Sequence, residues 1–233
     1  MAVKSTMPIH SFMLRLEKYI LTDLSRCLID LSGCPQIINC YSDDTTVEDG
    51  KTIYNVFLEF APNGDLPKHR AKNSHHNILI FPTQDGKKND VKITDFRLAK
   101  RFGFAEKKNT NLGTPMYLSP ESIALNDVNL GCDIWALGCV VAEMVTRRTA
   151  WKCDTDAEAR SQLYRIGFTK ELPEIPRELS EQGNDFLGKC WERDCSKRWT
   201  AEMLLKLLKK MILIRVSDRL LIKELIWSLQ IVL

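Results

Sequence analysis

The chain has 233 residues, of which 44% are hydrophobic and 27% are charged, a composition typical of globular domains rather than of disordered or fibrous chains. Lys and Arg number 33 and Asp and Glu number 30, and the resulting net charge of +3 does not indicate a nucleic-acid partner. No segment reaches the roughly 18 uncharged apolar residues that a membrane-spanning helix requires, so we expect no membrane span.

The first 61 residues are predicted to form strands around one helix. Ala2-Val3-Lys4 has the pattern of a strand end whose beginning is missing. Apolar residues at helical spacing predict a helix over residues 12–29. Two further strands are expected at residues 37–41 and 52–60, on either side of an Asp49-Gly50 turn.

The rest of the chain is predicted to combine one hairpin with helices. Residues 77–81 and 91–94 have strand patterns and flank a turn at residues 84–87. From Asn129 onward the apolar spacing is helical, and Thr200 is a candidate N-cap for a further helix. The order of these elements predicts an α+β fold, with a small β-rich lobe followed by a large, mainly helical lobe.

Four segments occur in an order that is improbable by chance. They are Ala2-Val3-Lys4, Asn77-Ile-Leu-Ile80, Asp95-Phe96-Arg97 and Gly113-Thr-Pro-Met-Tyr-Leu-Ser-Pro-Glu121. This set resembles the signature motifs of eukaryotic protein kinases. Phe57-Leu-Glu-Phe-Ala61 and Leu172-Pro-Glu-Ile-Pro176 are similar to the plant-type mitogen-activated protein kinase kinase kinases.

The resemblance implies a bilobal kinase-like fold and a division of the chain. Residues 1–61 would form a partial small lobe, residues 62–210 a large lobe that lacks some of its helices, and residues 211–233 an atypical amphipathic tail. In the large lobe, the resemblance implies a buried ion pair between Glu121 and Arg198. It also implies that Asp133 ties down the catalytic loop.

The resemblance also implies which residues hold the cofactors ATP and Mg²⁺. Lys4 would contact the phosphates, with Glu17 orienting it, and Asn77 and Asp95 would hold Mg²⁺. Backbone groups would bind the adenine edge at Glu59 and Ala61.

The sequence departs from the family pattern at several points. We find no glycine-rich loop before Ala2 and few residues between Asp65-Leu66 and the catalytic loop. The slot of the catalytic Asp holds Ala71 when it is aligned from His69-Arg70, or Lys72 when it is counted back from Asn77, and neither side chain can act as a carboxylate base. Arg97 stands where the family has glycine. We therefore expect a truncated or degenerate kinase domain.

Three function classes remain open at this point. The first is a serine/threonine protein kinase that acts on protein substrates or kinase-cascade partners, and the second is a non-catalytic, kinase-like interaction module, which we favour for the mechanism of this chain. The third is metal or nucleic-acid binding, which the cluster of His69, His75 and His76 suggests, but which lacks suitably spaced acid or cysteine ligands. The eight cysteines form no C-x-x-C pair, and no secretory signal precedes them. We therefore expect reduced thiols and a cytoplasmic or nuclear location.

Overall fold

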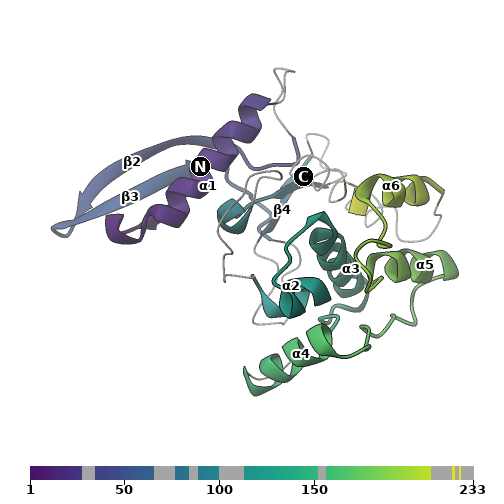
Figure 1. Cartoon of the computed structure of the whole chain (residues 1–233). Coiled ribbons are helices and arrows are strands. Elements are labelled where there is room, and N and C mark those ends of the chain that lie inside the picture. The colour runs from purple at the N-terminus through teal and green to yellow at the C-terminus, as the bar shows by residue number, and fades with distance from the viewer. Residues whose placement is uncertain are drawn as a thin grey trace. The chain divides into compact units, whose positions relative to one another are not determined.

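The computed structural model divides the chain into two compact units, which we describe one at a time (Figure 1). The N-terminal unit holds the described residues up to Ala99, and the C-terminal unit holds those from Gly113 onward. The residues that the structure describes are 1–27, 35–65, 77–83, 89–99, 113–151 and 156–210, with Ile222, Lys223 and Ile226.

The N-terminal unit is built on a three-stranded antiparallel sheet with the strand order β1-β3-β2. The strands are β1 (Ala2–Thr6), β2 (Cys40–Glu48) and β3 (Lys51–Leu58), and Lys4 pairs with Val56 across the β1–β3 ladder. The side chains of Tyr54, Val56 and Leu58 are almost completely buried and form the core of this unit. Helix α1 (Phe12–Cys27) follows the short 3-10 helix η1 (Pro8–His10) and contacts β2.

One strand of this sheet differs from the prediction. We expected a strand at residues 37–41, but Ile37 makes only an isolated bridge to Ile93, and the strand runs over Cys40–Glu48 instead. Most of that strand is exposed and polar. It is an edge strand held by its main-chain pairing to β3, so its side chains show little of the alternation on which the prediction depended.

The predicted hairpin is present in the N-terminal unit as β4 (Ile78–Pro82) and β5 (Asn89–Ile93). The segment before β2 anchors it, because the Ile93 amide donates to the Gln36 carbonyl at 2.8 Å and the Ile38 amide donates to the Ile93 carbonyl at 3.0 Å. The next amide, that of Thr94, donates to the Asn77 carbonyl at 2.9 Å. These bonds fix the position of the backbone that leads into Asp95.

The C-terminal unit is helical in its described residues. Helix α3 packs against α5, and α2 packs against α4. Most of the α3 side chains are buried, which explains the nearly continuous apolar sequence there. Asn129 caps α3. The Thr200 hydroxyl accepts a hydrogen bond from the Met203 amide, as expected of the N-cap that the sequence predicts there. The helices are α2 (Pro120–Ala124), α3 (Leu130–Thr146), α4 (Asp156–Phe168), α5 (Glu181–Cys190) and α6 (Ala201–Lys210), preceded by the 3-10 helix η3 (Pro115–Tyr117).

A buried ion pair joins the start of this unit to its end. Arg198 donates to both oxygens of the Glu121 carboxylate, at 2.6 and 3.0 Å, and the two side chains are 0% and 6% exposed. The Arg198 guanidinium also donates to the carbonyls of Gly131 and Glu192. The structure therefore confirms the predicted pair.

The C-terminal tail is described at only a few positions. In residues 211–233 the structure describes three positions, and two of them, Ile222 and Ile226, are 1% and 0% exposed. Both are apolar residues of the segment that the sequence analysis describes as an amphipathic tail. Among the described residues, no helix has both the length and the apolar character needed to cross a membrane.

The first prediction concerns the Glu121–Arg198 pair. Arg198→Ala leaves the Glu121 carboxylate buried without its cation, which should cost about 3–5 kcal/mol of unfolding free energy. Urea unfolding followed by tryptophan fluorescence measures this loss, because the described tryptophans, Trp135, Trp151, Trp191 and Trp199, lie in the C-terminal unit and residues 1–100 contain none. Lys197→Ala is the matched control, since it removes an exposed pair with Asp194 that solvent screens, and it should leave the unfolding free energy nearly unchanged. Equal losses in the two variants would contradict the prediction.

The second prediction concerns the pH dependence of the same pair. Burial disfavours the charged form of Glu121, but hydrogen bonds and charge from Arg198 outweigh burial and hold the pKa of this carboxyl below its ordinary 4.5. The stabilisation is therefore complete at neutral pH and is lost as the pH falls through the lowered pKa. The unfolding free energy of the wild-type chain should thus approach that of Glu121→Gln on acidification. Urea titrations at neutral and at acid pH measure the gap, and a gap independent of pH would contradict this assignment.

Candidate functional site

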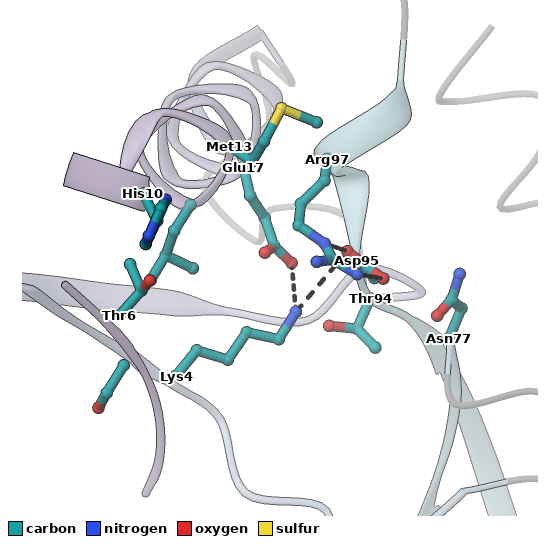
Figure 2. A pocket seen from close by; sticks show the side chains of 11 residues that line it. Lys4, Thr6, His10, Met13, Glu17, Asn77, Thr94, Asp95 and Arg97 are labelled. Carbon is teal, nitrogen blue, oxygen red and sulfur yellow. Dashed lines mark hydrogen bonds and ion pairs between the residues drawn. The ribbon is translucent and has the colours of Figure 1, made fainter. Parts of the chain in front are cut away.

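A pocket of about 450 Å³ lies within the N-terminal unit (Figure 2). Strand β1, the first two turns of α1 and the segment after β5 supply its walls. Its lining combines two acids with basic side chains. The chargeable and amide side chains around it are Lys4, His10, Glu17, Asn77, Asp95 and Arg97.

Glu17 is a buried carboxylate on the inner face of α1. Its neighbours along that face, Leu14 and Leu21, are apolar and buried, and Glu17 itself is 0% exposed. The Lys4 ammonium, which β1 presents from the sheet, donates to Glu17 Oε1 at 2.7 Å. Glu17 Oε2 is buried and has no hydrogen-bond partner within the described part of the chain. The ion pair therefore ties α1 to the sheet edge and leaves one acceptor in the pocket region.

Asp95 adopts a backbone conformation that is rare for residues other than glycine. Its φ and ψ are 67° and 64°, in the left-handed region, which Asp tolerates better than most side chains. The following residues form the 3-10 helix η2 (Phe96–Leu98), and Phe96 is 4% exposed where η2 contacts α1. The buried ring fixes η2 against the helix that carries Glu17.

Two cationic side chains, Lys4 and Arg97, approach the Asp95 carboxylate. Arg97 donates through Nε to Asp95 Oδ1 and through Nη2 to Asp95 Oδ2, the latter at 2.7 Å. The Lys4 ammonium lies 4.0 Å from Asp95 Oδ1. Figure 2 shows the resulting cluster of two acids and two cations, in which Lys4 lies between Glu17 and Asp95 and Arg97 binds Asp95.

These neighbours control the ionisation of Asp95. Burial raises the pKa of its carboxyl, but the hydrogen bond from Arg97 and the charge of Lys4 lower the pKa by more, so the net shift is downward. Asp95 is therefore ionised at neutral pH, although its side chain is only 19% exposed.

The structure brings four of the predicted site residues to this pocket: Lys4, Glu17, Asn77 and Asp95. It does not bring Glu59 or Ala61 to the pocket lining. Lys92 donates to both oxygens of the Glu59 side chain at 2.8 Å, and the Glu59 amide donates to the Asn39 carbonyl. Of the two backbone groups of Glu59, only the carbonyl could therefore face a nucleotide, and its role stays a prediction.

Several other predicted positions lie outside the described residues. Ala71 and Lys72, the alternatives for the catalytic-Asp slot, lie outside the described residues, as do the three clustered histidines. Asp133 lies in the first turn of α3, but the loop that it was expected to hold is not described. Among the described residues, no three His, Cys, Asp or Glu side chains lie close enough to hold a metal ion.

The sequence analysis missed the partnership between Arg97 and Asp95. From the sequence, Arg97 was noted only as the residue that stands where the family has glycine. The sequence analysis also missed His10 and Met13, which line the pocket. A signal was available for Met13, which precedes Glu17 by four residues and so shares its helical face, but not for His10, which lies in η1 before the helix begins.

Comparison with known proteins identifies the family to which this chain belongs. The family described as "Protein kinase domain" matches residues 69–209. The chain belongs to the protein kinase family. This match confirms the expected kinase resemblance and the α+β kinase fold, with a small sheet-containing part and a mostly helical part.

Among the curated relatives, plant kinase kinase kinases are prominent. Mitogen-activated protein kinase kinase kinase 20 of Arabidopsis thaliana is 39% identical, and the alignment covers 88% of this chain and 67% of that protein. Kinase kinase kinase 17 of the same plant is 32% identical over 88% of this chain and 61% of that protein. Kinase kinase kinase A of Dictyostelium discoideum is 37% identical over 67% of this chain and 19% of that protein. This chain thus spans about two thirds of the length of the two plant relatives and resembles mitogen-activated protein kinase kinase kinases.

The third prediction tests the Lys4–Glu17 pair of the kinase domain. Glu17→Ala removes a charge-assisted hydrogen bond from a buried position, which should cost about 1.5–3 kcal/mol. Hydrogen exchange of the α1 and β1 amides measures this loss in the full chain, because the N-terminal unit contains no tryptophan. Lys18→Ala is the control on the same helix. It removes a pair with Asp43 whose side chains are 35% and 29% exposed, and it should change exchange by less than about 1 kcal/mol. Unchanged exchange in Glu17→Ala would show that the pair does not hold the helix.

Proposed function

We propose that this chain is a nucleotide-binding domain of the serine/threonine kinase kinase kinase type in which phosphoryl transfer is impaired. The observation that carries the proposal is the convergence of Lys4, Glu17 and Asp95 on one pocket. Protein kinases use ATP and Mg²⁺, and they need a strand Lys paired with a helix Glu to hold the phosphates. The pair at Lys4 and Glu17 has that arrangement.

ATP binding is supported by the charge and exposure of the pocket. The Lys4 side chain is 37% exposed while its partner Glu17 is fully buried, so the ammonium is held in place and still accessible to an anion. The Arg97 guanidinium, 52% exposed, is a second cation on the same pocket. The family pattern adds the Glu59 carbonyl and the Ala61 amide for the adenine edge.

Mg²⁺ does not fit Asp95 in the arrangement that the structure shows. Mg²⁺ requires oxygen ligands in near-ideal octahedral geometry at about 2.0–2.1 Å. Both oxygens of Asp95 accept hydrogen bonds from Arg97, and the Lys4 ammonium lies 4.0 Å away. A metal ion bound to Asp95 would have to displace the guanidinium. Asn77, the other predicted ligand, lines the same pocket, but its amide alone is a weak ligand set.

The impairment of phosphoryl transfer is supported by the sequence of the catalytic loop. The family uses an Asp there to accept the proton of the substrate hydroxyl. This chain offers Ala71 or Lys72 in that slot, and neither is a carboxylate. The second candidate function is an active kinase of protein substrates in a mitogen-activated cascade, which the intact Lys4–Glu17 pair favours.

The fourth prediction tests nucleotide binding. Lys4→Met removes the phosphate-facing cation and should weaken ATP binding by at least about tenfold, as measured by calorimetric titration of the full chain. Lys51→Met, at an exposed position of β3, should leave the affinity unchanged. Hydrogen exchange of α1 confirms that the Lys4 variant is folded. Equal affinities for the wild-type chain and Lys4→Met would exclude the proposed pocket.

A phosphate-transfer assay separates the two candidate functions. Radiolabelled ATP and a mitogen-activated protein kinase kinase are incubated with the wild-type chain and with Asp95→Ala. If transfer is impaired, the two chains should give the same background incorporation. Incorporation by the wild-type chain that Asp95→Ala abolishes would establish the active-kinase alternative instead.

A further inference from the structure

Arg97 binds both oxygens of Asp95, the carboxylate that protein kinases use to bind a metal ion. Two of its three guanidinium nitrogens, Nε and Nη2, each donate to one Asp95 oxygen, so the planar guanidinium covers the edge of the carboxylate. The planar guanidinium fork matches the geometry of a carboxylate, and such charge-assisted bidentate pairs are among the strong hydrogen-bonded contacts in proteins. The Asp95 charge is thus already neutralised within the chain.

A metal ion would have to compete with a tethered cation. Only one residue separates Asp95 from Arg97, and the contact of η2 with α1 and the burial of Phe96 hold this turn in place. A short tether gives an effective concentration of at least the order of millimolar, and a guanidinium cannot lose its proton at accessible pH. Lys4 adds a second positive charge 4.0 Å from the same carboxylate, which disfavours a divalent cation further.

The same guanidinium retains capacity for an anion. Arginine has five N–H donors, and two of its three nitrogens bind Asp95 here. The Arg97 side chain is 52% exposed and lines the pocket together with Lys4. Lys4 and Arg97 therefore present two fixed cations to one cavity, and phosphate oxygens are preferred partners of both.

We propose that Arg97 takes the place of the divalent cation, so that the pocket binds the phosphates of a nucleoside triphosphate without metal. This inference rests on the nucleotide binding proposed above. Metal-free ATP carries more negative charge than its magnesium complex, and the pocket supplies its countercharge from Lys4 and Arg97. Mg²⁺ in solution therefore adds nothing to the affinity, and it lowers the concentration of the form that binds.

The test is a calorimetric titration of ATP into the full chain, once with EDTA and once with excess Mg²⁺. The wild-type chain should bind ATP in EDTA, with an affinity equal to or higher than in Mg²⁺. Arg97→Gly frees Asp95 for the metal, so Mg²⁺ should strengthen ATP binding to this variant by about tenfold or more. Arg97→Gln removes the charge while keeping a side chain of similar length, and should behave in the same way.

Arg147→Gly is the matched control. Arg147 is an exposed arginine that ends α3 in the C-terminal unit with a φ of 57°, so glycine fits its backbone without strain. This variant loses the same charge as Arg97→Gly, and it should keep the metal-independent binding of the wild-type chain.

The outcomes separate this inference from the proposed function. Stronger ATP binding by the wild-type chain in Mg²⁺, by about tenfold or more, would overturn the role of Arg97 and leave nucleotide binding standing. Binding of ATP and Mg²⁺ by Arg97→Gly, with no binding by the wild-type chain in either buffer, would show that Arg97 only blocks the site, which also overturns the inference. An absence of ATP binding in all variants and both buffers would overturn the inference and the proposed function together.

Discussion

The buried carboxylate of Glu17 is the constraint on which the arrangement of the candidate site depends. It lies on the face of α1 that also carries Leu14 and Leu21, where an unpaired charge would be costly. Lys4 meets that requirement at 2.7 Å, which fixes how α1 sits against β1. The ammonium so placed lies 4.0 Å from Asp95, and Arg97 adds a second cation at the same carboxylate. Each charge is tolerated because its neighbour has the opposite sign, so a change at one member alters the electrostatics of the others.

Much of the fold and part of the site could be predicted from the sequence, wherever the spacing of apolar residues or a family motif was clear. The helical spacing before Cys27 and after Asn129 reflects burial, which the structure reproduces in α1 and α3. The Glu121–Arg198 pair was predicted from the family motifs, and the two charges meet in the interior. The placement of Lys4, Asn77 and Asp95 around one pocket also matches the order of the motifs.

The rest depended on interactions that sequence patterns do not encode. Strand β2 is an exposed edge strand that is held by main-chain pairing to β3. Its polar sequence therefore lacks the alternation of apolar and polar residues from which a strand is predicted. The Asp95–Arg97 contact depends on backbone geometry. In a strand, residues two apart point the same way but about 7 Å apart, whereas the left-handed turn at Asp95 followed by η2 folds the two side chains onto each other. The residue types at positions 95 and 97 alone do not predict this turn.

The left-handed backbone of Asp95 means that the shape of this turn and its charge can be altered independently. Asparagine tolerates this conformation as well as aspartate does, and it has nearly the same size. Replacing Asp95 by asparagine would therefore discharge the position while the chain keeps its path from β5 into η2. Alanine would remove the charge and strain the turn as well. In a protein with both an acid and a basic side chain at this turn, that distinction lets electrostatic and conformational contributions to ligand recognition be assigned separately.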